Sequence, residues 1–166
     1  MKTFITLMLM SAAILAKCQT TASHQVTVNV SQVLDIRFHI GFTPNLNFNF
    51  NTANRLNNGI ERIAAAALQV RSNKSWMISV KAQNQFFDKI PAGPNSMPCS
   101  IVKIRKTLAP SGYFSLSTVD QQLSTGNKGN WDVLGNYFTM DYDITPGLNY
   151  DEGTYTLPVV FTITAN

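Results

Sequence analysis

Apolar and polar side chains alternate along most of the chain after residue 25. Three early runs carry this period of two: Val26, Val28 and Val30; Leu34, Ile36, Phe38 and Ile40; and Leu46, Phe48 and Phe50. Such alternation is typical of strands that bury one face. Ser31 and Gln32 interrupt the first two runs, so the sequence predicts either two consecutive strands or one long strand with a bend or bulge. The third run predicts another half-buried strand.

The middle of the chain is ambiguous at one point. Residues 51–59 are polar and predict a loop, and residues 61–70 fit two structures. Their four alanines and the spacing from Asn58 to Glu61 suit a capped helix. Their continuation through residues 71–80 suits a hairpin, which we favour. In that hairpin one face is apolar and consists of Trp76, Ile78 and Val80.

The second half of the chain also predicts strands. We expect strands over 98–107, 112–119 and 136–145, an irregular segment over 83–97 and a surface loop over 121–130. The last run predicts a buried C-terminal strand whose inward side chains are Tyr155, Leu157, Val159, Phe161 and Ile163. Pro158 lacks a backbone donor, so it predicts a sheet edge or a bulge at that point.

These elements predict an all-β fold, an antiparallel immunoglobulin-like β-sandwich of seven to nine strands. The chain has 166 residues, which corresponds to one domain, and we assign residues 19–166 to it. The formal net charge is only +4 and the charges are scattered, which argues against a nucleic-acid partner.

Residues 1–18 resemble a signal peptide, with Lys2 followed by an apolar run that is too short to span a bilayer. Cleavage after Cys18 would leave Gln19 first. The competing interpretation is lipidation of Cys18, although Lys17 departs from the small residue that bacterial lipoproteins carry there. Either way we expect an exported protein, extracellular, at the cell surface or in the periplasm, without a transmembrane segment. Cys99 is then expected to be a small buried side chain.

Chemistry-bearing residues are few, and we predict no enzymatic activity, no cofactor and no metal site. His24 and His39 are far apart in the sequence, and no nucleophile stands with a base and an orienting group. Asp141 and Asp143 share a predicted strand face, and carboxylates so placed can bind calcium. A solvated polar face explains them more simply, because the loop spacing of a calcium-binding hand is absent.

Aromatic residues give a second candidate site. Trp131, Tyr137 and Tyr142 cluster in the C-terminal third of the chain. Exposed rings with polar neighbours are one way in which sandwich proteins bind sugars. The three residues are therefore ligand-binding candidates for a monomeric secreted ligand-binding or carbohydrate-binding module.

Three passages together resemble exported bacterial pilin-type proteins, such as the subunits of class 5 fimbriae and the spore-coat-U-like families. They are Val26–Val30 with Leu34–Ile36, Leu68–Lys81, and Gly153–Ile163 with its Gly-Thr-Tyr start. The resemblance implies a structural or adhesive surface subunit that assembles with itself or other surface subunits, with an export chaperone as a further partner.

The same resemblance implies assembly by strand addition, in which an extended segment of one subunit fills a groove in the next. The candidate donor segment is residues 25–30, with Val26, Val28 and Val30 as the inserted side chains. The alternative is that these residues form the first strand of their own domain's sheet.

Overall fold

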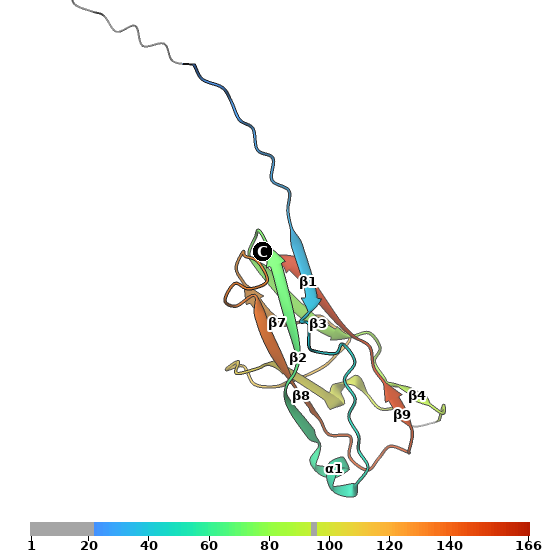
Figure 1. Cartoon of the computed structure of the whole chain (residues 1–166). Coiled ribbons are helices and arrows are strands. Elements are labelled where there is room, and N and C mark those ends of the chain that lie inside the picture. Colours follow the sequence, from blue (N-terminus) through green and yellow to red (C-terminus); the bar gives the residue numbers. More distant parts are fainter. Residues whose placement is uncertain (1–21, 94–95) are drawn as a thin grey trace, which may run out of the picture. The chain divides into compact units, whose positions relative to one another are not determined.

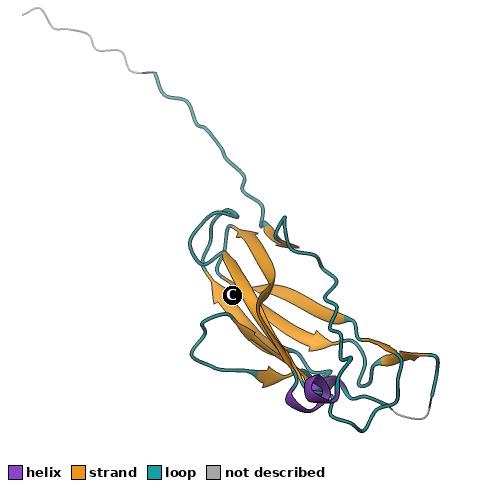
Figure 2. Ribbon diagram, turned by 60° about the horizontal axis from the view of Figure 1, so that its bottom comes forward, coloured by secondary structure: helices purple, strands orange, loops and turns teal. Residues whose placement is uncertain are grey.

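A computed structural model describes residues 22–93 and 96–166, so the predicted signal peptide and Cys18 lie outside the described residues. Residues 31–166 form the folded unit, and the residues before Ser31 belong to a separate unit. The folded unit is all-β with antiparallel sheets in a sandwich-like arrangement, as the alternating pattern predicted. Figure 2 shows strands making up most of it, with a short helix at one end.

The larger sheet has five strands in the order β1-β2-β8-β5-β6. Their bounds are Leu34–Phe38 for β1, Ile60–Ser72 for β2, Tyr137–Ile144 for β8, Val102–Lys106 for β5 and Phe114–Ser115 for β6. Strand β2 contains a register shift between Arg62 and Ala66, where Ala64 has a positive φ of 50°. The hydrogen-bonding pattern is antiparallel throughout.

The second sheet has three strands in the order β10-β3-β7, with bounds Val159–Ala165, Trp76–Ala82 and Gln121–Gly126. Short strands β4 (Asp88–Ile90) and β9 (Thr154–Thr156) form a separate pair. Helix α1 (Ala53–Asn58) precedes β2, and a 3-10 turn, η1 (Cys99–Ile101), precedes β5. Figure 1 shows the arrangement of these elements.

One apolar core is shared by the two larger sheets. Trp76, Ile78 and Val80 are wholly buried, which confirms the predicted apolar face of β3. The Trp76 ring stacks on Phe138 of β8 with 6.4 Å between centroids. Its indole N–H donates to the Asn127 carbonyl at 3.0 Å, so the polar atom of this buried ring is satisfied. Cys99 is buried and free, as expected.

Residues 61–70 are strand, so the hairpin interpretation is confirmed and the helix is not. The prediction of a loop over 51–59 was wrong for α1, which Thr52 caps by accepting the Arg55 N–H. The segment 83–97 contains the short strand β4, and the strand expected over 112–119 is reduced to two residues.

The predicted loop over 121–130 was wrong, because residues 121–126 form strand β7. This strand is polar because it lies at a sheet edge, where only Leu123 and Ser124 are buried. Gly126 fits this edge for a steric reason. A Cβ at that position would collide with the indole ring of Trp76.

Two predicted strands are absent because their residues lack a pairing strand. Residues 26–30 adopt no strand, and β1 begins only at Leu34. Residues 45–50 keep the predicted alternation of exposed asparagines and half-buried apolar side chains, yet they form no ladder. Alternation indicates which side of an extended segment faces the core. It does not by itself provide a neighbouring strand for backbone hydrogen bonds.

The C-terminal strand differs from the prediction in two ways. It is split at Leu157–Pro158 into β9 and β10. The sheet edge, one of the two features that Pro158 predicted, is present, because β10 is an edge strand. The C-terminal strand is not buried, because β10 lies at the edge of its sheet and its residues are exposed or half-buried.

Candidate functional site

Two strands near the ends of the folded unit each have one open edge. Among the described residues, β1 pairs with β2 alone and β10 pairs with β3 alone. The two strands approach each other although they belong to different sheets (Figure 1). An open edge presents unpaired backbone N–H and C=O groups to whatever lies beside it.

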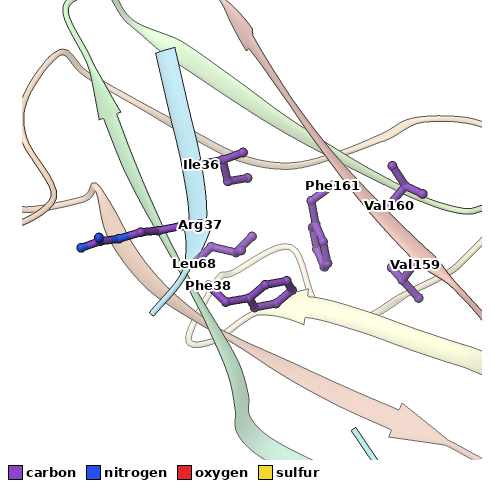
Figure 3. A pocket seen from close by; sticks show the side chains of 7 residues that line it. All are labelled: Ile36, Arg37, Phe38, Leu68, Val159, Val160 and Phe161. Atoms are coloured by element: carbon purple, nitrogen blue, oxygen red, sulfur yellow. The ribbon is translucent and has the colours of Figure 1, made fainter. Parts of the chain in front are cut away.

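A groove of about 310 Å³ lies between these edges. Figure 3 shows Ile36 and Phe38 pointing from β1 toward Phe161 of β10, while Arg37 points away. The rings of Phe38 and Phe161 meet edge to face with 5.9 Å between centroids. Leu68 of β2 also lines this space.

Two of the lining side chains, Phe38 and Phe161, face the core side of their strands yet remain partly exposed. Phe38 and Phe161 are half-buried, whereas Ile78 and Leu68 on the neighbouring central strands are at most 1% exposed. An inward apolar side chain normally becomes fully buried when the next strand covers it. The groove therefore has the apolar lining of a core and lacks a covering strand.

A larger cavity of about 1070 Å³ lies next to the groove and shares Phe38, Val159 and Phe161 with it. One wall is the segment 44–51, whose half-buried Leu46, Phe48 and Phe50 pack against the core. Other walls come from residues 154–159, and Tyr142 and Ile144 of β8 also line the cavity. We call these two adjacent spaces together the edge groove.

The segment 44–51 gives the edge groove a second backbone wall. It is extended, its apolar side chains alternate with exposed asparagines, and no strand within the described chain pairs with it. The edge groove is thus bounded by β1 and this segment on one side and by β10 on the other. The alternating pattern predicted ordinary strands for these residues, and only Pro158 indicated a sheet edge or a bulge.

The predicted donor residues lie in the unit that precedes Ser31. Val26, Val28 and Val30 are 71%, 76% and 79% exposed. A row of exposed valines is unusual on a protein surface, because each side chain exposes apolar area to water.

The three aromatic candidates do not come together. Trp131 lies beneath two guanidinium groups, those of Arg37 at 4.1 Å and Arg71 at 4.9 Å from the ring centroid. Tyr137 is 41% exposed and packs against His39, whereas Tyr142 lies on the opposite face of β8, in the core. Tyr142 instead contributes to the edge groove.

The acidic candidates are each paired with a base. Asp141 is wholly buried and accepts from Arg105 Nε at 2.8 Å, and Asp143 lies 3.5 Å from Lys103 Nζ. Burial by itself raises the pKa of Asp141. Hydrogen bonds from Thr107, the Ala64 N–H and Arg105 lower this pKa by more than burial raises it, so it lies below the usual 3.8. Within residues 22–93 and 96–166, no three acidic, histidine or cysteine side chains gather as metal ligands would.

Comparison with known proteins adds no assignment to this geometry. No family model matches the chain, and no curated protein matches it. Over the part of the chain that the structure describes, no helix is long and apolar enough to cross a membrane. The edge groove is therefore interpreted from its own geometry.

Proposed function

We propose that this protein is an exported bacterial structural or adhesive subunit, without enzymatic activity, which assembles by strand addition. In this proposal an extended segment of another subunit occupies the edge groove and completes an immunoglobulin-like sandwich. The observation that carries the proposal is the set of inward-facing apolar side chains at β1 and β10 that no strand covers.

The edge groove offers the two kinds of contact that an added strand uses. The open edges of β1 and β10 supply backbone donors and acceptors, which give affinity. Phe38, Val159 and Phe161 supply apolar surface for alternate side chains of the incoming strand. A small-molecule ligand would leave the backbone groups of both edges unpaired, so a polypeptide strand fits the site better.

The segment 25–30 has the properties of such a strand. Its valines recur at every second position, which places them on one face when the backbone is extended, about 6.6 Å apart. Thr27 and Asn29 then face the opposite side, toward solvent. Burial of three exposed valines contributes roughly 1.5–3 kcal/mol each before the cost of ordering the segment.

Polymer formation tests this function. We expect an immunoblot of cell-surface fractions to show a ladder in SDS without boiling, which collapses to one band after boiling, because strand-complemented subunits dissociate slowly. Deletion of residues 19–30 should abolish the ladder and leave a folded domain. Loss of folding would instead assign residues 25–30 to the domain's own sheet.

A pair of single substitutions sharpens the test. Val28→Asp places a charge on the inserted face and should abolish the ladder, since an unpaired charge in an apolar groove is strongly unfavourable. Thr27→Asp adds the same charge on the outward face and should leave the ladder intact. Equal ladders from both variants, or a single monomer band from the unaltered protein, would contradict strand addition.

A further inference from the structure

The linker between the donor segment and β1 is tied down by one side chain. Asn73 lies in the turn between β2 and β3. Its N–H donates to the Val33 carbonyl at 3.3 Å, which extends the pairing of β1 with β2 by one step. Its side chain accepts from the Val33 N–H at 3.0 Å and donates to the Ser31 carbonyl at 2.8 Å. We call this arrangement the Asn73 clamp; all of its residues belong to the folded unit.

The clamp bears on which copy of the donor segment can fill an edge groove. For a chain to fill its own groove, the segment that ends at Val30 must lie antiparallel beside β1, which begins at Leu34. Only Ser31, Gln32 and Val33 are then left to reverse the chain direction. A reversal there swings the Ser31 carbonyl out of line with Asn73 and breaks that bond.

Turn chemistry opposes the same reversal independently. Two-residue hairpin loops require positive φ angles, which Gly, Asn and Asp tolerate, and Ser31-Gln32 offers none of these. A three-residue loop would place a left-handed conformation at its last residue. That residue is Val33, whose branched Cβ disfavours it.

We infer that two features keep each donor segment out of its own edge groove: the Asn73 clamp, and a linker, residues 31–33, that lacks turn-forming residues. The groove is then filled by the donor segment of a second copy of this chain. This inference rests on the proposed function, because it assumes that residues 25–30 occupy an edge groove. It adds the identity of the partner and the device that excludes self-capping.

Disulfide trapping distinguishes a donor segment that occupies its own edge groove from one that occupies the edge groove of a second copy. We would replace Cys18 and Cys99 by alanine, introduce Val28→Cys and Val159→Cys into the same chain, and analyse oxidised material by SDS electrophoresis without reductant. We expect intermolecular products that form a ladder. Mixing chains that carry Val28→Cys alone with chains that carry Val159→Cys alone should give a disulfide-linked dimer.

Releasing the linker should redirect the segment. Asn73→Ala combined with Ser31→Asn and Gln32→Gly removes the side-chain clamp and supplies an Asn-Gly hairpin turn. We expect the ratio of intramolecular to intermolecular product to rise roughly tenfold or more. The variant loses the two Asn73 side-chain hydrogen bonds that oppose the reversal and gains a turn that favours it. The matched control is Lys74→Ala in the same turn, which leaves the clamp intact and should behave like the parent.

The outcomes are distinguishable. An unchanged ladder in the released variant, or an intramolecular product in the parent, would overturn the clamp inference and leave strand addition standing. A parent that gives neither cross-linked product nor an SDS-resistant ladder would overturn the proposed function itself. If the triple variant fails to fold, Ser31→Asn with Gln32→Gly alone tests the same shift with Asn73 in place.

Discussion

Among single residues, the buried carboxylate of Asp141 stabilises the bulge in β2. It accepts from the Ala64 N–H and from Arg105 Nε, each at 2.8 Å, and from the Thr107 hydroxyl at 2.5 Å. Ala64 has a positive φ, which costs free energy unless its surroundings compensate. Asp141 thus joins β2, β5 and β8 through one side chain.

Asp141→Asn should lower the free energy of unfolding by about 2 kcal/mol at pH 7, because the charge-assisted bonds are lost. The folded-state pKa of Asp141 lies below 3.8, so its stabilising contribution is present above that pH and is lost as the pH falls through the folded-state pKa. Urea denaturation at pH 7 and again in acid would show the difference between parent and variant shrinking as the pH falls.

Asp143→Asn is the matched control, since the side chain of its partner Lys103 is 46% exposed and surface pairs contribute about 0–1 kcal/mol. Equal losses for the two variants, or a loss for Asp141→Asn that does not depend on pH, would argue against this account.

At the scale of elements, the strands predicted from the sequence pattern differ from the observed ones at the sheet edges. The pattern located β3 and β8 well, because a central strand has a neighbour along both edges and its inward side chains are fully buried. It missed β7, whose residues 121–126 carry one buried apolar side chain, Leu123, and look like a polar loop. An edge strand needs only backbone pairing on one side, and no side-chain pattern encodes that pairing.

Gly126→Ala should destabilise β7 against β3 by about 1–3 kcal/mol, because the added Cβ collides with the Trp76 ring in a packed interior. Thermal unfolding followed by near-ultraviolet circular dichroism would report both stability and the setting of the indole. Thr125→Ala, on the exposed neighbour, should leave the melting temperature nearly unchanged. A tolerated Gly126→Ala would mean that Trp76 has freedom that the stacking on Phe138 does not suggest.

For the whole molecule, alternation alone predicted the all-β sandwich-like class, since period two recurs in several strands, among them β1, β3, β8 and β10. It did not predict the edge groove. Phe38 and Phe161 have the pattern of core residues, and their partial exposure follows from which strands are neighbours in space. That neighbourhood depends on contacts between the two ends of the folded unit, and no local window of sequence contains both.

Strand addition into the edge groove, as proposed, would make the stability of this protein depend on its solution as well as on its fold. If a second copy supplies the missing strand, mass action adds to the folded state a term that grows with the logarithm of protein concentration. The melting temperature should then rise as the protein is concentrated, and the variant lacking residues 19–30 should melt at a temperature independent of concentration. Calorimetry over a hundredfold dilution series measures this, provided that each sample is held until association has re-equilibrated, because strand-complemented subunits dissociate slowly. Under this proposal a subunit is least stable when it is alone, before a second copy fills its edge groove.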